Sequence, residues 1–252
     1  MKKSVSFALV ILAIAFVSCR NERNQKNIEE SSVTEAVDSM KTELGDEVLV
    51  MIDSLAKGCA DDTYNIDIPA SIASNLSERQ KLVKPDYLTD ASAAEEMVTL
   101  NQKINMLGIL IAERPIRAAY DLPLGEVDET IAKLLAEVRH PVNSAGYEGL
   151  SASECFERTY ASCKQKGMVS YFWKLNGALC SSCMFLISKN TGMFFENIGE
   201  EQWKAVVERV RSIQKAVEIL AEYDTEMAAV SDQMHFDEIP EDIDSARSYF
   251  EN

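Results

Sequence analysis

The C-terminal third of the chain carries the pattern that most limits the fold. Over about 25 residues, large apolar side chains recur every three or four positions, which places them on one face of a helix. They are Trp203, Val206, Val210, Ile213, Val217, Leu220 and Met227. Two arrangements satisfy this pattern: a coiled-coil seam, or a long helix whose apolar face is covered by neighbours inside a bundle. The second arrangement is the one expected here.

Four earlier segments show the same helical spacing. They cover residues 33–55, 97–111, 127–138 and 172–186. Gly58 is expected to stop the first of these helices, because glycine favours helix C-termini. Pro115 is expected to kink or end the second, with a turn or two continuing to Tyr120, because proline lacks the backbone N–H that a helix interior needs.

The chain has no run of alternating apolar and polar residues typical of β-strands. Helices joined mostly by short connections indicate an all-α fold, built as an irregular multi-helix bundle. We expect a single helical domain over residues 28–236, followed by an acidic C-terminal segment over 237–252. Residues 59–91 contain Pro and clusters of Asp, Ser and Asn, so they are expected to be mainly connection, with a short helix over 77–83.

Two helix boundaries carry specific signals. Ser151 and Glu154 have the spacing of a capping box, in which each side chain hydrogen-bonds a free amide of the first turn. The helix that they begin is expected to end near Lys164, with Gly167 in the left-handed conformation. For the apolar stretch that follows, a buried helix over 169–189 is expected, and a small β-hairpin near 184–196 remains the alternative.

The N-terminus has the pattern of an export signal. Lys2 and Lys3 precede an uncharged apolar run over residues 5–17, which ends in Ser18 and Cys19. The run is too short for a typical transmembrane helix, and a polar segment follows at once. The residues before Cys19, 1–18, are therefore expected to be a signal peptide that does not belong to the fold.

The sequence Phe16-Val17-Ser18-Cys19 resembles the lipobox of bacterial lipoprotein precursors, which are cleaved by signal peptidase II. Phe16 stands where leucine is usual. The resemblance implies that Cys19 is acylated, with palmitate among the acyl chains, and becomes the new N-terminus. Residues 19–27 would then be a flexible lipid tether, because residues 20–27 contain no apolar side chain. An ordinary secretory signal is the alternative.

The same resemblance suggests an address in the bacterial cell envelope. Arg20 follows the cysteine, where an aspartate would favour retention in the inner membrane. An outer-membrane lipoprotein facing the periplasm or the surface is therefore expected. The helical mature domain is also broadly similar to helical envelope lipoproteins of Bacteroidota, although no motif carries that likeness.

The charge of the chain excludes some partners. Asp and Glu total 41 against 25 Lys and Arg, and no basic cluster with interleaved aromatic residues is present. Nucleic-acid binding is therefore not expected. The acidic excess also argues against electrostatic adhesion to an anionic membrane, so membrane attachment is expected to come from the lipid on Cys19.

Five cysteines follow Cys19 in the sequence: Cys59, Cys155, Cys163, Cys180 and Cys183. The last two form a CxxC, which invites redox and metal hypotheses. Thioredoxin-type chemistry places the first cysteine at a helix N-terminus, whereas Cys180 lies in the middle of a helical segment. Covalent haem attachment requires histidine directly after the second cysteine, and Met184 is there instead. No metal site and no cofactor are predicted.

A disulfide is a structural hypothesis for these thiols. Within one helix, Cys155 and Cys163 would lie about 12 Å apart, too far to bridge each other. If the two helices around Gly167 form an antiparallel hairpin, Cys155 lies close to Cys180 or Cys183. A bridge from Cys155 to one of these two is the best disulfide prediction, with buried free thiols as the alternative.

No catalytic residue is predicted from the sequence. His140 and His235 have no nucleophile or metal motif around them, and the many carboxylates do not single out a catalytic pair. Aromatic residues gather in region 171–203, where core packing is the simplest explanation and a protein partner surface is the alternative.

The function expected from these observations is that of a lipid-anchored envelope protein that acts by binding or as a structural or assembly component. The alternative is a thiol-dependent redox or metal-binding protein that uses Cys180 and Cys183.

Overall fold

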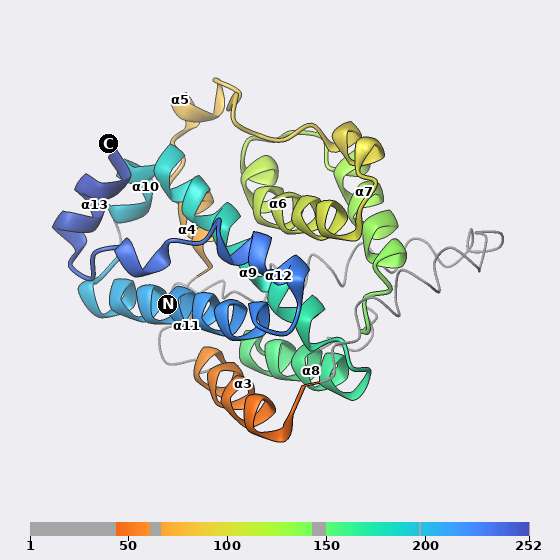
Figure 1. Ribbon diagram of the computed structural model, residues 1–252. Helices are drawn as coiled ribbons and strands as arrows, with labels where there is room; N and C mark the ends of the chain where they lie inside the picture. The colour runs from red at the N-terminus through yellow and green to blue at the C-terminus, as the bar shows by residue number, and fades with distance from the viewer. Residues whose placement is uncertain (1–43, 61–66, 143–149, 197, 252) are drawn as a thin grey trace.

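The computed structural model describes residues 44–60, 67–142, 150–196 and 198–251 (Figure 1). These residues form a multi-helix all-α fold, as the spacing of apolar residues predicted, and none of them lies in a β-strand. The helices are α3 (Asp46–Cys59), α4 (Ile68–Ser74), α5 (Glu78–Lys81), α6 (Leu100–Ala119), α7 (Gly125–Glu137), α8 (Ala152–Gln165), α9 (Val169–Lys189), α10 (Thr191–Phe195), α11 (Glu200–Ala221), α12 (Thr225–Ser231) and α13 (Ile243–Glu251). The 3-10 turns are η1 (Ala91–Glu96) and η3 (Phe236–Glu238). The expected signal peptide, the lipid tether and Cys19 lie outside the described residues.

Helix α9 is the centre of the fold. It runs diagonally through the molecule, with α6 on one side and α11 on the other (Figure 1). Its sequence is apolar around most of its circumference, and such a helix is stable when neighbours cover it on all sides. Trp173 and Ile187, near its two ends, are both fully buried.

The connection between α3 and α6 contains a helix that the sequence analysis missed. Helix α4 follows Asp67, whose side chain caps it, and Pro69 lies in its first turn. Proline is tolerated there because the amides of the first turn have no partner within the helix, so Pro69 was wrongly interpreted as a sign of loop. The short helix expected over 77–83 is present as α5, where Ser77 and Gln80 form a capping box.

Helix α6 continues past its proline. Pro115 lies inside the helix, which extends to Ala119, and the amide of Tyr120 donates to the carbonyl of Ile116 at 3.1 Å. The expected continuation beyond the proline is therefore confirmed. Proline removes one backbone hydrogen bond, and buried side chains on both sides of it hold the helix in place.

The predicted ends of α8 are confirmed as well. The hydroxyl of Ser151 accepts from the amide of Glu154, and the carboxylate of Glu154 accepts from the amide of Ser151, so the capping box is complete. Gly167 has a φ of 71°, and the amide of Met168 donates to the carbonyl of Cys163 at 2.8 Å. This is a Schellman turn, and it redirects the chain from α8 into α9.

The alternative of a β-hairpin near 184–196 is wrong. Residues up to Lys189 complete α9, and the side-chain amide of Asn190 donates to the carbonyl of Leu186 at 2.8 Å where the helix ends. The next residues form α10, which places Phe195 against Trp203 of α11 with ring centroids 5.1 Å apart. Burial of these aromatic rings favours the helical path over an exposed hairpin.

The acidic C-terminal segment packs on the same core as the preceding helices. Ile239 and Ala246 are buried, and the indole N–H of Trp203 donates to the carbonyl of Pro240 at 2.9 Å. The guanidinium of Arg211 donates to the carbonyl of Ile239 at 2.8 Å. Helix α11 therefore buries its apolar face inside the bundle, where α3, α9, α12 and η3 pack against it.

Candidate functional site

The CxxC lies in the middle of α9, as the sequence indicated, and both of its cysteines are buried. Cys180 lies about 16 Å along the helix axis from Val169, the first residue of α9. The free amides and the positive dipole end of the helix N-terminus, which lower the pKa of thioredoxin-type cysteines, are therefore far away.

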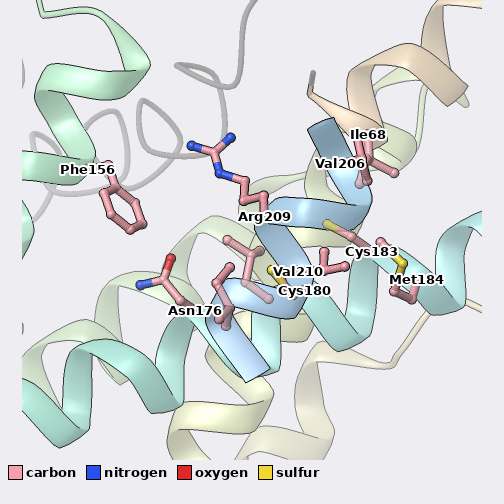
Figure 2. Close-up of a pocket in the computed structure, with 11 residues that line it drawn as sticks. Ile68, Phe156, Asn176, Cys180, Cys183, Met184, Val206, Arg209 and Val210 are labelled. Atoms are coloured by element: carbon pink, nitrogen blue, oxygen red, sulfur yellow. The ribbon is translucent and has the colours of Figure 1, made fainter. Parts of the chain in front are cut away.

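A small cavity adjoins the two thiols (Figure 2). Its walls come from α4, α8, α9 and α11, and they consist of Ile68, Phe156, Asn176, Leu179, Cys180, Cys183, Met184, Val206, Arg209, Val210 and Ile213. The free volume at its centre is about 20 Å³. That is space for roughly one water molecule, so a substrate would not fit without movement of the surrounding helices.

Two residues far away in the sequence join the CxxC. Cys59, the last residue of α3, lies close enough to Cys180 to raise the pKa of that thiol. Asp67 does the same for Cys183. Sequence reasoning placed neither residue at this site. The sequence held one signal for Asp67, because an acidic residue shortly before Pro69 is typical of a helix N-cap. No local signal indicated Cys59.

The surroundings of these thiols disfavour the reactive thiolate form. Burial raises the pKa of Cys59 to about 11 and that of Cys180 to about 12, and it raises the pKa of Cys183 well above its ordinary value. All three are therefore protonated at neutral pH. Because the thiolate is the nucleophile and the metal ligand, this arrangement does not favour thiol chemistry.

In the structure no disulfide joins Cys155 to Cys180 or Cys183. The cysteines within the described residues are all free and buried. Besides burial, the groups that shift the pKa of Cys155 are Glu154 and Arg158 of its own helix, whereas Cys180 has Cys59 as its neighbour from another helix.

Asp67 is a buried acid with one unsatisfied oxygen. Its Oδ1 accepts from the amide of Ala70 at 2.9 Å and caps α4, while its Oδ2 has no hydrogen-bond partner in the part of the chain that the structure describes. Burial raises the pKa of Asp67 to about 7, and the hydrogen bond from Ala70 opposes this shift. Near neutral pH the acid is therefore divided between its neutral and charged forms.

Arg209 brings a permanent positive charge to the wall of the cavity. Its guanidinium donates to the carbonyl of Cys59 and lies 5.9 Å from the ring centroid of Phe156. In Figure 2 its side chain extends away from Cys180, toward the side on which Phe156 lies. Arg209 therefore ties α11 to the end of α3 and to α8, which is a structural role.

The two histidines lie elsewhere. Nδ1 of His140 is 2.7 Å from the hydroxyl of Tyr171, and burial lowers the pKa of His140 to about 4, with a further contribution from Lys166. His235 is exposed beside η3. In the described ranges, no three His, Cys, Asp or Glu side chains are placed to hold a metal ion.

The aromatic residues of region 171–203 are mostly core residues. Tyr171, Phe172, Trp173, Phe194, Phe195 and Trp203 are all buried. Phe185 differs, because 46% of its surface is exposed. A partner surface built from the aromatic residues of this region would therefore depend on Phe185.

No helix among the described residues is both long enough and apolar enough to cross a membrane. The chain matches no protein-family model, no curated protein and no solved structure.

Proposed function

We propose that this protein is a lipid-anchored component of the bacterial cell envelope that acts by binding or as a structural or assembly subunit. The observation that carries the proposal is the N-terminal pattern, in which two lysines and an apolar run lead to Ser18 and Cys19. Acylation of Cys19 would attach the helical domain to a membrane, and the polar residues that follow would separate the two.

The candidate site supports a binding or structural role over thiol chemistry. Cys180 and Cys183 are buried in mid-helix, their pKa values are raised, and the cavity beside them holds about one water molecule. These are properties of a packed core rather than of a redox centre.

Metabolic labelling with an alkyne analogue of palmitate in a bacterial host tests the anchor. The wild-type chain should incorporate the label and sediment with the membrane fraction. The Cys19→Ser variant should lose the label and leave the membrane fraction. The Ser18→Ala variant is the matched control, because alanine keeps a small residue before the cysteine, and it should behave as the wild type. An unlabelled wild-type chain would refute the proposal.

A further inference from the structure

A projecting turn carries two strongly exposed aliphatic side chains. Leu82 and Val83 follow α5, and 83% and 71% of their respective surfaces are exposed. In Figure 1, α5 and the turn after it stand out from the top of the molecule, beyond the packed helices. Exposed apolar side chains that gather in this way on a protein surface usually mark a contact.

Residues on both sides of the projecting turn lie near the C-terminal end of α9. Gln80 lines the same surface groove as Lys189, and the ring of Tyr87 meets the ring of Phe185 edge-on with centroids 6.4 Å apart. Gln80 and Tyr87, on either side of Leu82 and Val83, therefore both lie near the C-terminal part of α9. The half-exposed Phe185 belongs to this part of the helix. We call Leu82, Val83 and Phe185 the apolar tip.

Positive charges flank the apolar tip. Arg79, Lys81 and Lys84 fall within six residues that contain no acid, in a chain whose acidic residues outnumber its basic ones by 16. The ammonium group of Lys189 lies 5.3 Å from the ring centroid of Phe185. Acidic residues also lie close by: Glu78 pairs with Lys81 at 2.9 Å, Asp121 also raises the pKa of Lys81, and Asp86 follows Lys84 by two residues. Residues 78–86 hold three basic and two acidic residues, so this stretch is weakly basic within a strongly acidic chain.

Aliphatic side chains bracketed by lysine and arginine fit the interface of an anionic bilayer. The apolar groups enter the acyl boundary, while the long basic side chains keep their charges at the lipid phosphates. A protein interface instead favours a broad, well-packed patch with several aromatic anchors, whereas the apolar tip offers two aliphatic residues and one half-exposed ring, that of Phe185.

We propose that the apolar tip and its basic flanks form a second, reversible membrane contact that binds anionic phospholipid and turns this end of the domain toward the bilayer. The inference extends the proposed lipid anchor, which would keep the domain within reach. Residues 20–43, which separate Cys19 from the first described residue, can span at most roughly 80–85 Å. Binding by the tip itself does not require acylation.

Vesicle co-sedimentation tests the contact. The chain begun at Arg20 lacks the acylated cysteine and keeps every described residue. We expect it to sediment with vesicles that contain phosphatidylglycerol and to be released by added salt. The Leu82→Ser/Val83→Ser double variant should weaken this binding at least about tenfold, because the inserted apolar surface is lost.

Val98→Ser is the matched control. Val98 is an equally exposed aliphatic residue, at 84%, and it lies before α6 rather than on the tip. This variant should bind as the wild type, and circular dichroism should show the same helix content in all three chains. Lack of binding by the wild type, or equal binding by the double variant, would overturn the proposal.

These outcomes are independent of the labelling experiment on Cys19, because the vesicle assay contains no acylated protein. One contrary outcome is that the wild type does not bind vesicles and instead binds a protein that the double variant does not bind. In that case the tip is a protein interface and the membrane proposal is wrong.

Discussion

Gly108 of α6 lies directly against Ala178 of α9. A Cβ atom added to Gly108 would come within 2.8 Å of the Cβ of Ala178 and within 3.0 Å of backbone atoms of Ala178 and Leu179. The absence of a side chain at Gly108 therefore lets the two helices approach closely at this point. Because α9 is the centre of the fold, this contact affects how tightly the whole core is packed.

The Gly108→Ala variant should lower the free energy of unfolding by about 1–3 kcal/mol, measured by urea denaturation. Alanine improves helix propensity by up to about 1 kcal/mol, but the atoms that it meets are backbone or Cβ atoms that cannot move alone. Gly58→Ala in α3 is the matched control, because an added Cβ meets no atom within 4 Å there. It should be neutral or stabilising, and equal effects of the two variants would contradict the steric explanation.

The Asp67→Asn variant should change how stability depends on pH. The pKa of Asp67 is raised from 3.8 to about 7 in the folded protein, so the folded state binds the extra proton between these values. Its contribution to stability is therefore greatest below about pH 4, declines by up to about 4 kcal/mol between about pH 4 and pH 7, and levels off above that. Asparagine caps helices as aspartate does, but it does not titrate, so the variant should not show this decline.

Unfolding curves for the Asp67→Asn variant between pH 4 and pH 8 give the measurement. Its stability relative to the wild type should increase with pH across this window. Asp90→Asn is the control, because Asp90 is an exposed N-cap whose pKa is lowered by hydrogen bonds from Ser92. The relative stability of that variant should not increase with pH. A constant difference between Asp67→Asn and the wild type would contradict the raised pKa of Asp67.

The thiols of the folded protein should resist alkylation. Maleimide labelling at neutral pH should be slow for Cys59, Cys180 and Cys183, because burial keeps them protonated and covered, and complete after denaturation. Mass spectrometry of the labelled protein identifies the modified positions. Rapid labelling of Cys180 in the folded protein would instead support the thiol-dependent alternative.

The Gly167→Ala variant should destabilise the α8–α9 turn by about 1 kcal/mol. Gly167 has a φ of 71°, a conformation that costs alanine more than glycine because of the added Cβ. Gly167→Asn should cost less, since asparagine tolerates the left-handed region. Thermal unfolding of both variants measures the difference, and an equal or smaller loss for alanine would argue against a strained turn.

Local patterns in the sequence determined most of the long helices and several of their ends, although α4 was missed. The spacing of apolar residues predicted the all-α fold, and Ser151 and Gly167 marked the two ends of α8, because caps and turns depend on residues that are neighbours along the chain. The N-terminal signal and the acylation of Cys19 remain predictions, since those residues lie outside the described ranges.

Tertiary packing decided what lies beside the CxxC. The sequence suggested Cys155 as a bridging partner, but the structure places Cys59 from α3 near Cys180 and the cap of α4 near Cys183. The helix over 169–189 was predicted, and packing of the aromatic rings decided that α10, rather than the second strand of a β-hairpin, follows it. Side-chain periodicity identifies which face of a helix is buried, but the helix that covers that face is selected by the fit of the whole core, which no local pattern contains.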